Sequence, residues 1–460
     1  IVGGAIVLAL TMAYGPIGWG IERVTVLALA APVFVAALNW RRGIYIALAY
    51  VIVEGAVANL LYPSVAGLFI KDALVICAYA GFAGCVLKRS EVWSVPASIV
   101  RPFLVLVAIV VLGGLNPNGV PILVTLIGVR TLLLCVPLYA LGFHYARDAD
   151  AVGRLVRFVL ITSLPIVLFG IYQYVAGPEA LSALGEGFER TVWMVGTEAT
   201  EDMIYRPAST FAFVGQFGAY LFFITLLAFA EVHSPTRTMG KGPATLIFWC
   251  SAVAVVLQSQ RTTWVLLPIA VVLIYVLNGT VKTALRAAPV WVAGVALAVI
   301  IGAPVLENRL PVLVEGGVFA DRMQATSAGF ASTMLTSRAL IGQGTGTALG
   351  AARHVTGQTP EAFESGWYGP FYMFGIWGVL VYVWLYAAVL HAAWRGMRAA
   401  PNERRWLMAA LFTYLLLTAV VSGPINYPPT NIYFWLFAGA LAGYAAGAAR
   451  QVRAAAPVVV

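Results

Sequence analysis

Long uninterrupted apolar stretches limit what this chain can fold into more than any other feature. Stretches of about twenty such residues lie at 121–143, 155–175, 211–230 and 367–390, and each can cross a hydrocarbon core of ~30 Å as a helix. Because hydrocarbon supplies no water to the backbone, only helices and closed barrels span a bilayer. The stretches are continuously apolar rather than alternating, which favours a helical bundle and excludes a barrel.

The composition agrees with a membrane protein. Only 10% of the residues are charged, against about 25% in soluble domains. The net charge of +9 would suit nucleic acid, but we attribute it to the Lys and Arg that membrane proteins keep on the cytoplasmic side, and we expect no nucleic-acid partner. The four cysteines lie in apolar stretches with neither metal-ligand spacing nor a paired framework. We therefore expect buried free thiols and no metal site.

We predict an all-α, polytopic bundle of roughly twelve to fourteen transmembrane helices, in a single transmembrane domain over residues 1–460. The candidate spans are 2–18, 22–39, 43–61, 65–87, 100–116, 119–143, 153–176, 209–231, 244–260, 262–278, 286–305, 367–390, 405–423 and 430–449. Lys and Arg concentrate in alternate connections throughout this order. The positive-inside rule makes these connections, and with them both termini, cytoplasmic.

Two long connections fall on the opposite side of the membrane, at 178–208 and 306–366. Connections of this length in a compact protein are usually functional or disordered. Both keep apolar and aromatic residues, including Phe188, Trp193 and Phe319. We therefore expect both to contain partly folded elements that lie against the outer face, and we expect short helices in 306–366, the large outer loop.

Arginines at this outer boundary include Arg206, Arg261, Arg322 and Arg338. They suit a ligand that bears phosphate, because a guanidinium stays charged and grips phosphate oxygens in a fork. The alternative is that boundary arginines reach lipid headgroups or cap helix C-termini. Arg206 and Arg261 favour the first interpretation, since each stands beside small or polar residues.

Three other features of the outer connections are candidates for chemistry. Glu364 lies three residues before the span that begins at Trp367; partial desolvation there makes a carboxylate more basic and suits a general base, with a solvated interfacial acid as the alternative. His354 is the only histidine on this side, and it is either catalytic or an ordinary loop residue. The sequence Gly-Gln-Gly-Thr-Gly at 342–346 is no P-loop, because no Gly-Lys-Ser/Thr follows; alone it predicts a flexible turn.

Four charged residues lie in or near the spans: Glu54, Lys71, Asp72 and Arg130. Charges inside a membrane are costly and are functional candidates by default. We favour the simpler interpretation that Lys71 and Asp72 pair with Glu54 and Arg130 and thereby hold the bundle together.

Several motifs follow one another in a fixed order. Glu364-Ser365 is followed by nine residues and then by Gly375-Ile376-Trp377-Gly378, downstream of the glycine turn of Gly342, Gly344 and Gly346. Upstream come Arg206-Pro-Ala-Ser-Thr-Phe, Gln258-Ser259-Gln260-Arg261, and Arg322, twenty residues before the turn. Over roughly residues 200–380 this order resembles the O-antigen ligase and polymerase superfamily. Glu364 stands where the ligases of that family have a catalytic histidine, and Ser209 where the family often has glycine.

The resemblance implies a glycosyltransferase of the GT-C type in a bacterial inner membrane, with the outer loops in the periplasm. Its donor is a glycan on undecaprenyl diphosphate, its acceptor is a sugar hydroxyl, and it needs neither a cofactor nor a metal. A base deprotonates the acceptor, which attacks with inversion. The candidates to hold the diphosphate are Arg206, Arg261, Arg322 and Arg338; the candidate base is Glu364, with His354 in reserve.

Glu364 in place of histidine favours a polysaccharide repeat-unit polymerase over an O-antigen ligase, whose acceptor would be lipid A core or a protein. A lipid-linked oligosaccharide flippase or other transporter is the alternative from another class. An outward cleft lined by Arg206, Arg261 and Glu364 would support transfer, whereas a central cavity around Arg130 and Glu54 would support transport. The expected partners are the donor, the acceptor glycan, the lipid bilayer and, for a polymerase, a chain-length regulator.

Overall fold

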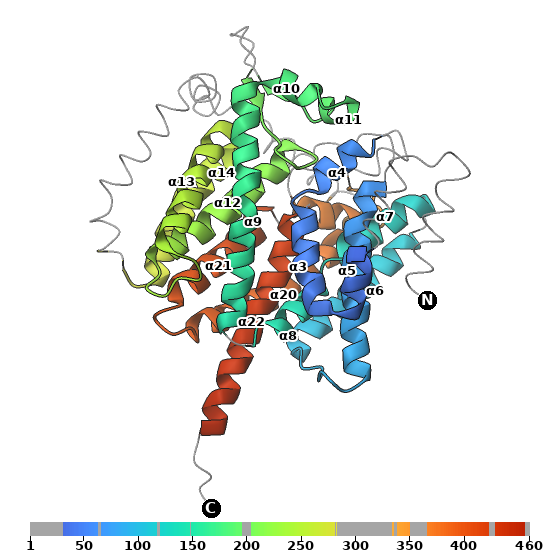
Figure 1. Ribbon diagram of the computed structural model, residues 1–460. Coiled ribbons are helices and arrows are strands. Elements are labelled where there is room, and N and C mark those ends of the chain that lie inside the picture. Colours follow the sequence, from blue (N-terminus) through green and yellow to red (C-terminus); the bar gives the residue numbers. More distant parts are fainter. Residues whose placement is uncertain are drawn as a thin grey trace, which may run out of the picture.

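The computed structural model describes residues 31–62, 66–116, 120–147, 149–195, 204–280, 282, 334, 338–349, 366–422 and 428–455. These residues form a bundle of helices (Figure 1). Within them, nine helices are long and apolar enough to cross a membrane, and a bent pair adds a tenth. The chain is therefore a multi-pass membrane protein, as the apolar stretches predict.

The helices follow the predicted spans closely. The nine spanning helices are α5 (Ala66–Leu87), α6 (Ala97–Gly114), α7 (Ile122–Leu133) continued by α8 (Leu138–Tyr145), α9 (Ala149–Ala176), α12 (Val214–His233), α13 (Lys241–Gln258), α20 (Tyr368–Arg398), α21 (Arg405–Leu417) with the π-helical turn η2 (Thr418–Ser422), and α22 (Thr430–Ala455). The bent pair is α3 (Trp40–Val51) and α4 (Glu54–Leu60), and α14 (Arg261–Leu277) is a shorter apolar helix.

Some predictions fall on parts that the structure does not describe. The predicted spans 2–18 and 286–305 lie outside the described residues, as does the first half of 22–39, of which residues 31–38 are helical. Of the large loop 306–366, the structure describes 334, 338–349 and 366, including the short helix α18 (Arg338–Ile341). The predicted large outer loop and the orientation of the termini therefore stay predictions.

Two of the predicted spans are interrupted. The helix pair α3–α4 bends by 62° between Val51 and Glu54, and the predicted span 119–143 divides into α7 and α8. Pro137 precedes α8, and proline breaks helices because it has no N–H to donate and its ring clashes with the preceding turn. The bend between α3 and α4 has no proline near it. Its backbone groups bond instead to Thr210, which is distant in the sequence.

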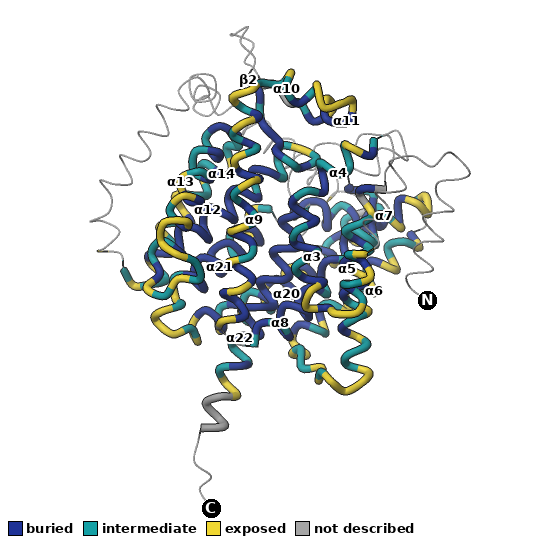
Figure 2. The backbone as a smooth tube through the Cα atoms, viewed as in Figure 1, coloured by how far each residue is buried: buried dark blue, intermediate teal, exposed yellow. Residues whose placement is uncertain are grey.

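The centre of the bundle is aromatic. In α12, 78% of the residues in the membrane-spanning stretch are buried. In α6, which lies on the outside of the bundle, only 22% are buried. The ring of Phe223 on α12 lies 4.3 Å from that of Tyr414 on α21 and 4.8 Å from that of Tyr433 on α22, centre to centre. Figure 2 shows the buried residues concentrated along these inner helices. Such aromatic contacts make α12 the central helix of the bundle.

The connection 178–208 carries short elements at the upper end of the bundle in Figure 1. They are the helices α10 (Pro178–Ser182) and α11 (Glu186–Glu189) and the antiparallel strands β1 (Trp193–Val195) and β2 (Ile204–Arg206). Leu181, Phe188 and Tyr205 form a small apolar cluster of their own. Gly187 lies directly on α4, because a Cβ there would be 2.2 Å from the carbonyl oxygen of Asn59. These contacts dock the connection onto α4.

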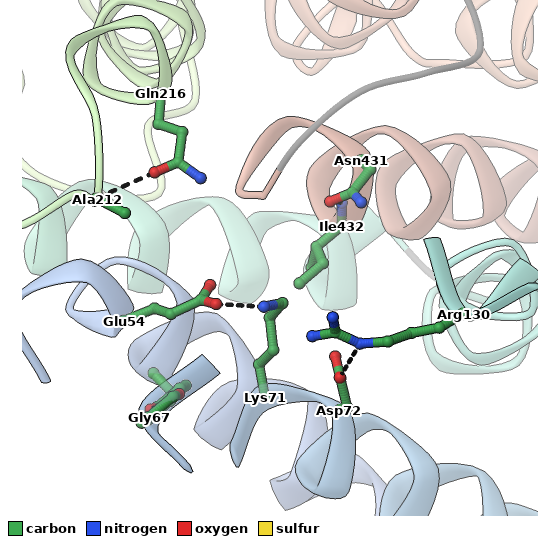
Figure 3. Close-up of polar contacts among 10 residues, drawn as sticks. Glu54, Gly67, Lys71, Asp72, Arg130, Ala212, Gln216, Asn431 and Ile432 are labelled. Atoms are coloured by element: carbon green, nitrogen blue, oxygen red, sulfur yellow. Dashed lines mark hydrogen bonds and ion pairs between the residues drawn. The ribbon is translucent and has the colours of Figure 1, made fainter. Parts of the chain in front are cut away.

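The four intramembrane charges are paired, as we favoured. Lys71 donates to Glu54, and Arg130 donates to Asp72. Both carboxylate residues are buried, Glu54 at 6% and Asp72 at 7% exposed. Figure 3 shows the two pairs meeting where α4, α5 and α7 approach one another. The cysteines agree with their prediction in part: all four are free thiols, but only Cys77 and Cys135 are buried, whereas Cys85 and Cys250 are half-buried.

We expect Lys71→Met to lower the free energy of unfolding by about 3–5 kcal/mol, because it leaves the buried Glu54 carboxylate without its partner. The double variant Glu54→Gln, Lys71→Met should recover much of this loss, since no buried unpaired charge remains. Thermal unfolding of the purified protein in detergent measures both. A Lys71→Met protein as stable as the wild type would show that the pair does not hold the bundle.

Candidate functional site

A pocket of about 510 Å³ lies where α12 and α14 begin and α13 ends. Its lining comes from the 178–208 connection, the start of α12 and the α13–α14 turn: Arg190, Thr191, Arg206, Ala212, Phe213, Val214, Gly215, Ser259, Gln260, Arg261 and Thr262. Three of these residues are arginines, and no carboxylate is among the described lining residues. Three arginines thus line one pocket, and it contains both arginines that the sequence singled out, Arg206 and Arg261.

Arg206 reaches the pocket from the last position of β2, opposite Trp193 on β1. Its Nε donates to the carbonyl oxygen of Gln258 at the end of α13, over 3.1 Å. The bond uses one N–H of the guanidinium and fixes its direction. The side chain is half-buried, which strengthens its electrostatic interactions relative to bulk water.

The segment after Arg206 is anchored to α9. Ser209 has a left-handed backbone with φ of 53°, the conformation that favours glycine. Gln173 brackets it: the Gln173 Oε1 accepts from the Ser209 N–H at 2.7 Å, and the Gln173 Nε2 donates to the Ser209 carbonyl at 3.0 Å. The Ser209 hydroxyl donates to the Ile166 carbonyl at 2.7 Å. These bonds stabilise Ser209 at the position where the motif that this segment resembles often has glycine.

The same segment satisfies the broken helix pair. The Ala56 N–H donates to the Thr210 carbonyl at 2.8 Å, and the Thr210 hydroxyl donates to the Ile52 carbonyl. Gly55 lies against Phe211 and Ala212, since a Cβ there would be 2.1 Å from their backbone atoms. The bend between α3 and α4 thus receives its backbone partners from the stretch that lines the pocket.

The α13–α14 turn is held by Gln258, which is 1% exposed. Its Nε2 donates to the Val214 carbonyl on α12 at 2.7 Å, and its Oε1 accepts from the Gln260 N–H at 3.1 Å. The Gln260 side chain fits against Gly218, where a Cβ would lie 1.6 Å from the Gln260 Oε1. The start of α14, and Arg261 with it, is therefore fixed relative to the start of α12.

Arg190 is the site residue that sequence reasoning did not assign. It follows α11, and its guanidinium lies 4.8 Å from the ring centre of Tyr62, at the end of α4. This cation–π contact, about 0.5–1 kcal/mol at an exposed site, directs an exposed side chain toward the pocket. Nothing in the sequence around Arg190 marks it, because its position depends on how 178–195 docks onto α4.

The glycine turn lies outside the lining of this pocket, and it is packed rather than a free surface turn. Gly342, Gly344 and Gly346 have φ of 74°, 105° and 90°, which glycine alone adopts without strain. The N–H groups of Gln343 and Gly344 donate to carbonyls of α20, and the buried Thr345 donates its hydroxyl to the Val110 carbonyl of α6 at 2.6 Å. The prediction of a flexible turn is wrong, because three helices surround it.

The glycines of the Gly-x-x-Gly motif have a similar structural role. Gly375 has φ of 64° and ψ of −157°, and its non-helical backbone places a kink inside α20. A Cβ on Gly375 would lie 2.5 Å from the Ala339 carbonyl oxygen of α18, and one on Gly378 would lie 2.6 Å from that of Pro370. Both glycines permit close backbone approaches. Together with the turn, they fix the chain on either side of 350–365.

The structure does not show where the side chains of the other predicted site residues lie. Glu364, His354 and Arg322 lie outside the described residues, and for Arg338 only its place at the start of α18 is given. Among the residues that the structure does describe, no three His, Cys, Asp or Glu side chains gather as metal ligands would. The structure thus brings Arg206 and Arg261 together and leaves the predicted base untested.

We expect Gly346→Ala to destabilise the protein by about 2–4 kcal/mol, because the φ is unfavourable for alanine and the added Cβ would lie 2.2 Å from the Val124 carbonyl oxygen. Gly84→Ala on α5 is the matched control, since its Cβ would meet nothing within 4 Å. It should be neutral or stabilising by up to about 1 kcal/mol. Thermal unfolding in detergent compares the two; equal stability would mean that the turn is loosely packed.

Comparison with known proteins adds no assignment. No protein-family model matches this chain, and no curated protein matches it. Its function therefore has to be inferred from its own site: three arginines around one pocket, at the end of the bundle where two helices begin.

Proposed function

We propose that the protein is a polysaccharide repeat-unit polymerase. It transfers a glycan from an undecaprenyl-diphosphate carrier to an acceptor sugar hydroxyl at the periplasmic face of a bacterial inner membrane, with both termini in the cytoplasm. The observation that carries the proposal is the pocket on which Arg190, Arg206 and Arg261 converge. The order of motifs around it supplies the substrate class.

The charge of the pocket suits a diphosphate leaving group. When the glycosidic bond breaks, the diphosphate departs with two or three negative charges, and cations placed in advance where charge develops are usually the largest catalytic term. A guanidinium grips two phosphate oxygens at once. Because the Gln258 carbonyl already directs the Nε of Arg206, little reorganisation is needed when the donor arrives.

The surroundings of the pocket suit a donor that arrives in a lipid. The pocket lies at the ends of the apolar helices α12, α13 and α14, and the ends of spanning helices are where lipid headgroups meet water. Phe213, which lines it, is 41% exposed although it is aromatic. An exposed aromatic side chain beside three arginines fits a ligand with an apolar chain next to a charged group.

The acceptor requires a base. We assign this role to Glu364, with His354 in reserve. The base takes the proton from the acceptor hydroxyl, the hydroxyl oxygen forms a bond to the anomeric carbon, and the bond from that carbon to the diphosphate oxygen breaks, with inversion. The glycine turn and the Gly375 interruption support this assignment indirectly, because they fix the chain on both sides of 350–365.

Transport fits the described residues less well. A flippase or transporter needs polar groups that a substrate can use along the bundle interior. Glu54 and Asp72 are instead engaged by Lys71 and Arg130. A ligase shares the donor chemistry, and glutamate at position 364 favours the polymerase.

We expect Arg206→Ala and Arg261→Ala each to lower the rate of transfer by about 100- to 1,000-fold, because each removes a preorganised cation from the leaving group. Single-turnover transfer from a lipid-diphosphate-linked glycan in proteoliposomes measures this. Arg237→Ala, an exposed arginine in the α12–α13 connection, is the control and should react at the wild-type rate. If both pocket variants transferred glycan at the wild-type rate, the diphosphate would not bind in this pocket.

We expect Glu364→Gln in the native host to abolish long glycan chains while single repeats still reach the surface, because polymerisation alone requires the base. Surface glycan resolved by length measures this. Loss of all attached glycan, with lipid-linked polymer accumulating, would identify a ligase instead. Chains of normal length would exclude Glu364 as the base.

A further inference from the structure

We infer that Gln173, on α9, is a positioning residue for the arginine-lined pocket: it holds the left-handed turn at Ser209, and through that turn it sets the position of Arg206. Gln173 is not among the residues that line the pocket, so it acts through the chain and not by touching a ligand. The inference rests on the proposed function only for the identity of that ligand as a diphosphate.

The segment between β2 and α12 is neither helix nor strand. It covers residues 207–213 and joins Arg206, the last residue of β2, to Val214, the first residue of α12. Ala208 and Ser209, in this segment, are buried, at 0% and 3% exposed. Because buried backbone groups need hydrogen-bond partners, the groups that supply these partners decide where the segment lies.

Gln173 supplies two of the partners with one side chain. Its Oε1 accepts from the Ser209 N–H at 2.7 Å, and its Nε2 donates to the Ser209 carbonyl at 3.0 Å. Gln173 is 2% exposed, so water hardly competes for these bonds. A single amide group therefore holds Ser209 on both sides of its backbone.

The rest of the contact comes from the same face of α9. Ile166, Gly170 and Gln173 are spaced by four and three residues, which places them on one side of the helix. The Ile166 carbonyl accepts from the Ser209 hydroxyl at 2.7 Å. A Cβ on Gly170 would lie 3.4 Å from that of Ser209 and 2.4 Å from the ring of Phe217 on α12. Glycine at position 170 thus lets the segment come close enough to α9 to reach Gln173.

The turn at Ser209 depends on this support. Its φ of 53° is unfavourable for a residue with a side chain, and the bonds from α9 offset that cost. Arg206 lies three residues earlier, and its Nε donates to the Gln258 carbonyl. The arginine is therefore held at its guanidinium by Gln258 and at its backbone by the turn. A displacement of about 1 Å in such a group can lower a rate about 100-fold.

The inference is tested by Gln173→Met with inorganic pyrophosphate as the probe, by calorimetry on the purified full-length protein in detergent. Methionine keeps an unbranched side chain and removes both bonds to Ser209, so pyrophosphate should bind about tenfold or more weakly, the effect of one hydrogen bond to a charged group. A role in folding alone would lower the number of sites titrated and leave the Kd of the folded molecules unchanged.

Two variants accompany this measurement. Gln173→Asn keeps the amide on a side chain one methylene shorter, so it should weaken binding less, and it gives the same test if the methionine variant does not fold. Ser163→Ala is the matched control, because it removes a buried hydroxyl of α9 that bonds to the Leu160 carbonyl at 2.7 Å and does not line the pocket. Its Kd for pyrophosphate should equal that of the wild type.

Double variants show whether Gln173 acts through Arg206. Added to Arg206→Ala, Gln173→Met should weaken binding no further, because the guanidinium that it positions is already absent. Added to Ser209→Gly, it should weaken binding less than it does alone, since glycine adopts the left-handed turn without support. A wild-type Kd in Gln173→Met, losses that add to those of Arg206→Ala, or no pyrophosphate binding to the wild type would overturn the inference.

Failure of the proposed function would look different. Pyrophosphate binding that depends on Gln173, in a wild-type protein that transfers no glycan, would leave the inference standing and refute the proposed function. Active transfer by the wild type, with an unchanged donor KM and an unchanged pyrophosphate Kd in Gln173→Met, would refute the inference alone.

Discussion

Backbone hydrogen bonding in hydrocarbon is the constraint on which this structure depends. A spanning helix that bends exposes N–H and C=O groups that lipid cannot satisfy. At the bend between α3 and α4, Thr210 supplies both an acceptor and a donor. The stretch that repairs the bend also carries Arg206 at its start and Ala212 and Phe213 in the pocket wall. The same few residues thus satisfy the backbone of the bent helix pair and line the pocket.

Charge is handled in two opposite ways in this bundle. Between α4, α5 and α7, two acids and two bases neutralise one another. In the pocket, three arginines come together from three separate segments of the chain. The contrast separates the charges that pair inside the bundle from those that line one pocket.

Much of the fold could be predicted from the sequence, because an apolar stretch of sufficient length has few alternatives in a membrane. Neither interruption of a span was predicted: 119–143 was expected to be continuous despite Pro137, and the bend before Glu54 depends on Thr210, which is 158 residues away from Ile52. The same holds for the site. Motif order placed Arg206 and Arg261 among the candidates, but Arg190 depends on tertiary docking. The glycine turn was misjudged, because the left-handed backbone that glycine permits serves close packing as readily as flexibility.

The position of α12 has one further consequence. Binding sites usually belong to the parts of a protein that open most easily, such as loops and lids. Here the pocket includes the first residues of the most buried spanning helix. The backbone amide hydrogens of the first hydrogen-bonded turn of α12 should therefore exchange with solvent as slowly as those of the core. The pocket and the core then belong to one cooperative unit, so that heat or detergent would not unfold the pocket while the bundle stays folded.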